Sequence, residues 1–224
     1  MLFSLLLLAH LLTDFTLQTI KMAQLKTKSR LITAAHASIF GLLSFVFLLP
    51  YLSRFIGGCI LLLTILHYLV DRARAYIIER FRCNNLLLFL MDQGVHLGFI
   101  GLIAFFQEPL LPYIDKRLMA YLVGYLLVTH PSIIFIYYAA KDLLPHSNHS
   151  SLILDNRRKY LTIVERGVCL SLFLLPGHFY LFVPVLTTIR VLLERDLLYK
   201  FNVGTGNLIA AAIGLYLRLF LNEV

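Results

Sequence analysis

The sequence has few charged residues, few cysteines and no bias toward glycine or proline. Charged residues make up 14% of the 224 positions and hydrophobic residues 59%, whereas an average soluble domain has about a quarter and about a half. This composition argues against a soluble globular enzyme. The three cysteines, Cys59, Cys83 and Cys169, are too few and too scattered for a disulfide framework or a cysteine-type zinc ribbon. Twelve glycines and seven prolines argue against a collagen-like or disordered chain.

Long apolar stretches dominate the chain and predict a membrane protein. The mean hydropathy is +0.81, and a transmembrane helix needs roughly 20 apolar residues to cross a hydrocarbon core of about 30 Å. We therefore expect an all-α fold, a polytopic transmembrane helical bundle of about eight spans that forms a single integral membrane domain over residues 1–224. The expected spans lie near residues 1–20, 31–50, 55–72, 85–106, 117–138, 160–176, 178–195 and 207–222. Because the sixth and seventh are short and tightly joined, seven spans, or eight with a re-entrant pair, are alternatives.

Basic residues cluster in alternate loops and predict the orientation of the bundle. The formal net charge is +8, which in a membrane protein usually reflects cytoplasmic loops that face anionic lipid. We therefore expect membrane lipids, and no nucleic acid, as partners. The positive-inside rule places both termini outside and the following loops in the cytoplasm: 21–30, 73–84, 139–159 and 196–206.

Two further segments bear on the topology. The first apolar stretch has no basic region before it and no small-residue cleavage site, so we expect a span and not a signal peptide. The segment 72–82 is basic and amphipathic, and we expect it to extend the third helix at the cytoplasmic surface.

Ionisable side chains recur at a fixed spacing inside the first four expected spans. Such residues are costly at bilayer depth and mark a functional site by default. Three of these spans carry a histidine and an aspartate four residues apart, which places both on one helix face. The polar residues are His10, Asp14 and Gln18 in the first span, His36 in the second, His67 and Asp71 in the third, and Asp92, Gln93 and His96 in the fourth.

The order within each pair places these groups at one depth. The first and third spans run inward and have the histidine first, whereas the fourth runs outward and has the aspartate first. In each pair the aspartate is therefore nearer the cytoplasm, with the histidine about 6 Å deeper. Counted from the expected cytoplasmic ends, all these His and Asp residues except the shallower Asp71 lie roughly 8–16 Å below that surface. Four helices thus present polar groups to one layer of one leaflet.

This set of side chains favours a divalent metal site, with zinc as the first choice. Zinc takes histidine nitrogen and carboxylate oxygen, and helix bundles build metal sites from inward-facing histidines and carboxylates. The expected metal ligands are His10, His36, His67, His96, Asp14 and Asp92. The expected catalytic groups are Asp14, Asp71 and Asp92, each of which could bind the metal, support a metal ligand or act as a general base. The expected substrate contacts include Gln18 and Gln93. Two alternatives use the same groups: a pathway for a proton or cation, and polar packing that holds the helices together.

A second group of charged residues lies in the expected spans of residues 160–222. Glu165 and Arg166 fall in the sixth span, and Arg190 and Glu194 fall at the cytoplasmic end of the seventh. Ion pairing among them is one interpretation. The other is that an arginine binds an anionic head group or phosphate, which makes Glu165, Arg166 and Arg190 candidate substrate-binding residues. The Gly-rich stretch 201–207 lacks the spacing and the lysine of a phosphate-binding loop, so we expect a flexible segment before the last span.

Several of these motifs together resemble a known family. HLLTDFTLQ at 10–18, His36, HYLVD at 67–71, DQGVH at 92–96, the Glu165-Arg166 pair and a late Gly-Thr resemble a bacterial membrane-protein family known as domain of unknown function 3307. The resemblance extends over nearly the whole chain, although Thr187 and Thr188 stand in the span where members of the family carry a lysine. It implies a location in the bacterial inner membrane and carries over no activity.

Three functions are compatible with these features. The leading hypothesis is an intramembrane metal-dependent hydrolase or transferase that acts on a lipid or lipid-linked substrate from the cytoplasmic leaflet. A bound metal would lower the pKa of its water to about 7 and polarise a carbonyl or phosphoryl oxygen. The second hypothesis is a cation or proton transporter that uses the same His/Asp cluster, and the third is a non-enzymatic membrane scaffold. The sequence carries no signal for an oligomeric state.

Overall fold

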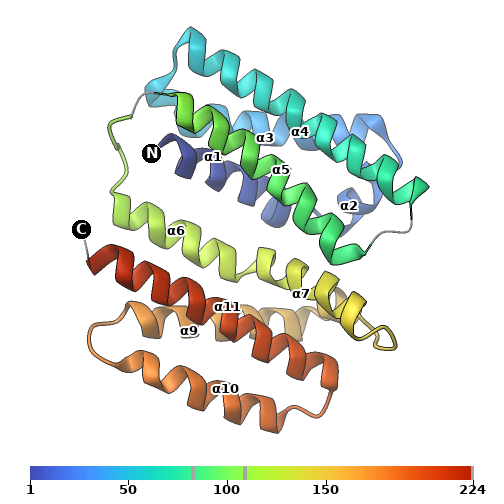
Figure 1. Ribbon diagram of the computed structural model, residues 1–224, viewed down its shortest axis with the longest axis vertical. Coiled ribbons are helices and arrows are strands. Elements are labelled where there is room, and N and C mark those ends of the chain that lie inside the picture. The colour runs from blue at the N-terminus through green and yellow to red at the C-terminus, as the bar shows by residue number, and fades with distance from the viewer. Residues whose placement is uncertain (82–83, 108–109, 223–224) are drawn as a thin grey trace. The chain divides into compact units, whose positions relative to one another are not determined.

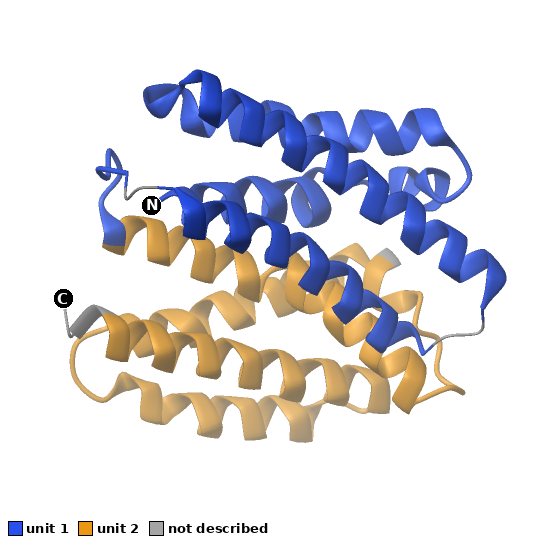
Figure 2. Cartoon of the chain, turned by 45° about the horizontal axis from the view of Figure 1, so that its top comes forward, with its two compact units in different colours: residues 1–116 blue, residues 117–224 orange. Residues whose placement is uncertain are grey.

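The computed structural model describes residues 1–81, 84–107 and 110–222, and every regular element in these residues is a helix. Arg82 and Cys83, near the end of the expected 73–84 loop, lie outside the described residues. The chain divides into two compact units, Met1–Lys116 and Arg117–Val224 (Figure 2). The all-helical prediction is confirmed, and each unit is described by itself.

Unit 1 is built around four helical segments that surround a common interior. Its elements are α1 (Leu2–Leu11), the π-helix η1 (Leu12–Leu17), α2 (Ile20–Lys26), α3 (Arg30–Leu48), the short η2 (Leu49–Tyr51), α4 (Arg54–Arg80) and α5 (Asn85–Phe106) (Figure 1). Helices α1 and α4 each pack against both α3 and α5. The starts of α3, α4 and α5 are fixed by the side chains of Ser29, Ser53 and Asn84, each of which accepts a hydrogen bond from a main-chain amide in the first turn.

The first expected span, near residues 1–20, is interrupted. The helix formed by α1 and η1 ends at Leu17, Gln18 is extended, and α2 then leaves at an angle of 101°. Much of the expected 21–30 loop is therefore helical. The bend turns α2 back toward the bundle, and the buried side chain of Lys26 is the result.

Unit 2 contains the remaining helices, which pack around α11. They are α6 (Lys116–Val128), α7 (His130–Leu143), α8 (Ser151–Leu154), α9 (Asn156–Leu174), η3 (Phe179–Leu181), α10 (Phe182–Leu193) and α11 (Leu197–Asn222). Helix α11 contacts α7, α9 and α10. Gly214 allows the close approach of α9, because a Cβ atom there would lie 2.7 Å from Cβ of Phe173.

Five helices are long and apolar enough to cross a membrane, or six if the bent pair in unit 1 is one span, among the residues described. They are Arg30–Tyr51, Arg54–Arg80, Asn85–Phe106, Lys116–Leu143 and Leu197–Phe220. The prediction of about eight spans is therefore too high. The expected sixth span lies in α9, whose polar residues include Glu165 and Arg166. The expected seventh lies in an apolar helix, Phe179–Leu193, of fewer than 18 residues, which at 1.5 Å per residue is shorter than a hydrocarbon core of about 30 Å.

Two local predictions have opposite outcomes. Helix α4 continues to Arg80, so the basic segment after the third span does extend that helix, as expected. The Gly-rich stretch 201–207 was expected to be flexible, and this prediction is wrong because the whole stretch lies within α11. Packing explains the presence of a glycine there: a Cβ atom on Gly206 would overlap the guanidinium group of Arg166.

Candidate metal centre

The polar residues of the first four expected spans lie together in the interior of unit 1. Helix α1 and η1 carry His10 and Asp14, α3 carries His36, α4 carries His67 and Asp71, and α5 carries Asp92, Gln93 and His96. Each of the seven His and Asp residues is at most 6% exposed. Asp14 lies in the π-helical segment, a local widening of the helix that occurs frequently at functional sites. The spacing of four residues and the packing of the helices thus bring the groups to one place.

One carboxylate oxygen of Asp14 is the centre of the cluster. Its Oδ1 atom lies 3.1 Å from Nε2 of His36, 3.3 Å from Nε2 of His67 and 4.0 Å from Nδ1 of His10. These three imidazoles come from three different helices. Helix packing, and not one local motif, therefore assembles them.

Asp71 contributes a second carboxylate to the same cluster. Its Oδ2 atom lies 3.6 Å from Nε2 of His36 and 3.8 Å from Nε2 of His67. Its other oxygen, Oδ1, accepts a hydrogen bond of 2.9 Å from the ammonium group of Lys26, and both side chains of this ion pair are less than 10% exposed. The ion pair leaves one oxygen of Asp71 directed at the histidines.

These atoms are close enough to share a metal ion. Two groups have ligand atoms that all lie within 4.8 Å of one another: His10, Asp14 and His67, and His36, His67 and Asp71. Ligand atoms around a tetrahedral zinc ion with bonds of 2.0–2.2 Å are about 3.3–3.6 Å apart, which is within the range of separations in the cluster. In addition, Nδ1 of His10, Nε2 of His67 and Oδ2 of Asp71 are buried and have no hydrogen-bond partner among the described residues. Buried polar atoms are rarely left unsatisfied, so the residues fit a cation at this position.

The α5 residues lie beside these groups and have partners of their own. Nδ1 of His96 is 2.8 Å from the main-chain oxygen of Asp92, and Oδ2 of Asp92 is 3.3 Å from the guanidinium group of Arg74. The His96 ring lies 4.3 Å from that of His67 between centroids. The two predicted ligands on α5 are thus adjacent to the cluster without being members of either group of close ligand atoms.

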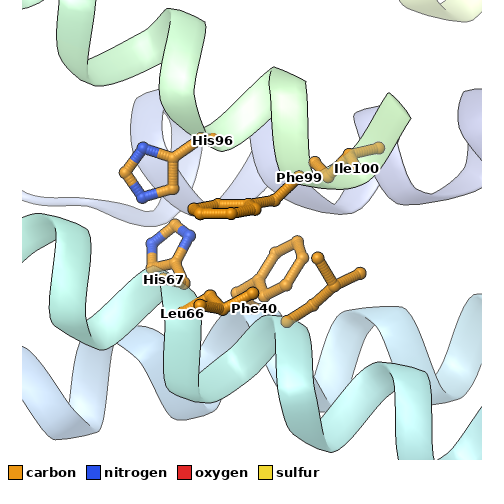
Figure 3. Close-up of a pocket in the computed structure, with 7 residues that line it drawn as sticks. Phe40, Leu66, His67, His96, Phe99 and Ile100 are labelled. Carbon is orange, nitrogen blue, oxygen red and sulfur yellow. The ribbon is translucent and has the colours of Figure 1, made fainter. Parts of the chain in front are cut away.

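A small apolar pocket adjoins the two histidines. It is lined by side chains of α3, α4 and α5 and has a volume of about 10 Å³, room for about one water molecule. Figure 3 shows the rings of His67 and His96 near one another at this pocket, with Phe40, Leu66 and Phe99 around it. Nε2 of His96 is buried and has no hydrogen-bond partner among the described residues. The histidines therefore contribute the polar side chains of a mainly apolar lining.

The two predicted glutamine contacts differ in position. Gln93 lies inside the cluster and bonds to His10, Asp14 and Asp92. Gln18 directly follows η1, at the bend before α2, and its buried Oε1 atom has no hydrogen-bond partner among the described residues.

The charged residues of unit 2 form two separate arrangements. Arg190 bonds to Glu165 at 2.6 Å and to Glu194 at 3.2 Å, as the ion-pair interpretation predicts. Partial burial acts to raise the pKa of Glu194, but hydrogen bonds from two following main-chain amides and from Arg190 hold that pKa below its ordinary value. Arg166 is 1% exposed and lies apart from this group, donating to Oγ of Ser132 at 2.6 Å and to Oδ1 of Asn202 at 2.5 Å.

Some members of these clusters could not be identified from the sequence. The sequence places Lys26 in an expected cytoplasmic loop, and the basic segment 72–82 gives no reason to single out Arg74. Ser132 and Asn202 carry no motif. Lys26 and Arg74 each lie near an expected span that carries an aspartate. Many other loop residues do so too, and this signal therefore does not distinguish the two.

Comparison with known proteins gives one match. The model of a family described as protein of unknown function (DUF3307) matches residues 2–114. This region contains every His, Asp and Gln residue of the cluster. No curated protein and no solved structure matches the chain.

Proposed function

We propose that this chain, which belongs to the DUF3307 family, is an intramembrane metal-dependent hydrolase or transferase that acts on a lipid or lipid-linked substrate. The observation that supports the proposal is the convergence of three imidazoles and two carboxylates at 3.1–4.0 Å in the interior of unit 1. Such a donor set suits zinc, which binds histidine nitrogen and carboxylate oxygen.

The proposed roles follow from the contacts. His10, His36 and His67, with Asp14 and Asp71, hold the metal. A zinc ion in such a site supplies Lewis acidity, which polarises a carbonyl or phosphoryl oxygen and makes water more acidic. His96 serves the substrate side of the cluster, because it lines the apolar pocket and its buried Nε2 has no hydrogen-bond partner among the described residues. Asp92 accompanies it, four residues earlier on the same helix.

The location forms part of the same proposal. Three helices long and apolar enough to span a bilayer, α3, α4 and α5, carry most of the cluster residues, which suits a substrate that reaches the site from the membrane. From the distribution of basic residues we propose a bacterial inner membrane protein with both termini outside and the site in the cytoplasmic leaflet. The arginines of unit 2, Arg166 and Arg190, stay candidates for contact with an anionic substrate group.

One observation favours a second function, a pathway for a proton or cation. Polar side chains, buried except for the partly buried Gln93, form a series that runs from Lys26 through Asp71, His36, Asp14 and Gln93 to Asp92. Ionisable groups in such series serve as proton relays in membrane proteins. The same groups would then carry charge and would not activate a substrate.

Metal analysis of the detergent-purified full chain tests the metal site. We expect about one zinc ion per chain in the wild type and loss of zinc in His67→Ala, because His67 belongs to both groups of close ligand atoms. The matched control is His146→Ala, which removes an exposed histidine from the region between α7 and α8. A wild-type protein that retains no zinc after incubation with it would remove the metal-dependent function.

A paired measurement separates the enzyme from the transporter. Lipid profiles are compared between cells that express the wild type and cells that express His67→Ala, and ion flux is measured with both proteins in reconstituted vesicles. The enzyme predicts a lipid or lipid-linked species that changes only with the wild type. Identical lipid profiles together with a flux that only the wild type supports would favour the transporter.

A further inference from the structure

Gln93 links three members of the metal cluster through one amide group. Its Oε1 atom lies 3.1 Å from Nε2 of His10, and its Nε2 atom lies 3.0 Å from Oδ2 of Asp92 and 3.4 Å from Oδ2 of Asp14. We infer that Gln93 is a positioning residue of the metal site, which directs His10 to bind metal through Nδ1. This inference rests on the proposed function, and it replaces the substrate-contact role predicted for Gln93 from the sequence.

The carboxylates determine the orientation of the Gln93 amide. A glutamine amide has two N–H donors on nitrogen and an acceptor on oxygen, whereas an ionised carboxylate only accepts. Reversing the amide would direct its oxygen at oxygens of both Asp14 and Asp92, with no proton between them. The NH₂ group therefore faces the two aspartates, and the carbonyl oxygen faces His10.

The orientation of the amide determines the tautomer of His10. Because the carbonyl oxygen of Gln93 can only accept, Nε2 of His10 must carry the proton and donate it. In a neutral imidazole the other nitrogen, Nδ1, then carries a lone pair. The hydrogen bond made by one ring nitrogen commonly sets which nitrogen of a histidine binds metal.

The lone pair on Nδ1 of His10 lies near the negatively charged carboxylate of Asp14. Nδ1 of His10 is buried, has no hydrogen-bond partner among the described residues, and lies 4.0 Å from Oδ1 of Asp14. A lone pair and a carboxylate oxygen repel each other, and a cation bound to both removes the repulsion. The same amide also holds Oδ2 of Asp14, so Oδ1 is the oxygen left for the imidazoles.

The resulting donor set is mixed and can be recognised by spectroscopy. His10 would bind through Nδ1, whereas His36 and His67 present Nε2 to Asp14. Removing Gln93 would free the His10 ring to rotate and to change its tautomer. Loss of a residue that supports a metal ligand typically lowers metal affinity by roughly 10–100-fold.

The first test measures Co²⁺ affinity of the detergent-purified full chain by absorbance titration. We expect Gln93→Leu to weaken Co²⁺ binding by roughly 10–100-fold and to alter the visible spectrum of the bound ion. The matched control is Gln24→Leu on the exposed face of α2, which should leave both unchanged. In a His10→Ala background, the effect of Gln93→Leu should become several-fold smaller, whereas a merely structural role of Gln93 would give the same loss in both backgrounds.

The second test needs no substitution. In the zinc-loaded wild type with ¹⁵N-labelled histidine, NMR should show one metal-bound imidazole coordinated through Nδ1 with its Nε2 proton retained. A His10 signal with zinc on Nε2, or a Co²⁺ affinity of Gln93→Leu within twofold of the wild type, would overturn the role of Gln93 and leave the proposed function standing. If the wild type binds neither Co²⁺ nor zinc, the proposed function and the inference fail together.

Discussion

Replacement of Lys26 by methionine should destabilise the metal-free protein and strengthen its binding of zinc. The ammonium group of Lys26 lies 2.9 Å from Oδ1 of Asp71, and the two side chains are 9% and 1% exposed. Methionine keeps much of the length of the lysine side chain and removes its charge. The substitution therefore leaves the Asp71 carboxylate buried without its cation.

The expected magnitude follows from this burial. Removing one partner of a buried ion pair costs about 3–5 kcal/mol, because the other charge stays buried without compensation. The double replacement Lys26→Met with Asp71→Leu should recover most of that loss, since an apolar pair in place of a buried ion pair is often neutral or stabilising. Bound zinc supplies positive charge next to Asp71, so the cost of Lys26→Met should be smaller in its presence. By linkage, each 1.4 kcal/mol, or about that, by which zinc reduces the destabilisation caused by Lys26→Met corresponds to a tenfold gain in the zinc affinity of that variant.

The measurement is denaturant-induced unfolding of the purified protein in detergent micelles, followed by circular dichroism with chelator and with saturating zinc. Lys28→Met is the matched control, because Lys28 is exposed just after α2, and it should change the free energy of unfolding by less than about 0.5 kcal/mol. A Lys26→Met protein as stable as the wild type in chelator would refute the buried ion pair. Weaker zinc binding by that variant would refute the placement of the metal beside Asp71.

Two substitutions in unit 2 test its packing by the same unfolding measurement. Gly214→Ala should lower the free energy of unfolding by about 1–3 kcal/mol, because the new Cβ would lie 2.7 Å from Cβ of Phe173. The control Gly204→Ala on the same helix meets no atom within 4 Å and should raise the free energy of unfolding by roughly 0.5–1 kcal/mol. Equal effects of the two substitutions would contradict the close contact of α9 and α11. Ser132→Ala should lower the free energy of unfolding by about 1–3 kcal/mol, because it removes an acceptor that lies 2.6 Å from the buried guanidinium group of Arg166. An unchanged free energy of unfolding would show that this hydrogen bond contributes nothing to stability.

Much of the helical architecture follows from local properties of the chain. Hydrophobic length predicted five spans that the structure has as helices of sufficient length and apolarity, and the basic extension of α4 was also expected. The predicted number of eight membrane spans was too high, because the apolar stretches were counted without regard to the polar residues of α9 or to the short length of the helix at 179–193. The helical state of residues 201–207 was missed because the role of Gly206 depends on Arg166, a neighbour on another helix.

For the metal cluster, the sequence by itself determined which residues share a helix face. His and Asp residues four apart lie on one side of any α-helix, so His10 with Asp14 and His67 with Asp71 could be paired before the fold was known. Tertiary structure alone decided the atomic arrangement: that Oδ1 of Asp14 meets the imidazoles of His36 and His67, and that α2 returns at 101° to place Lys26 on Asp71. The physical reason is that helical periodicity fixes the direction of a side chain relative to its own axis, whereas distances between atoms on different helices depend on how the helices bend and pack.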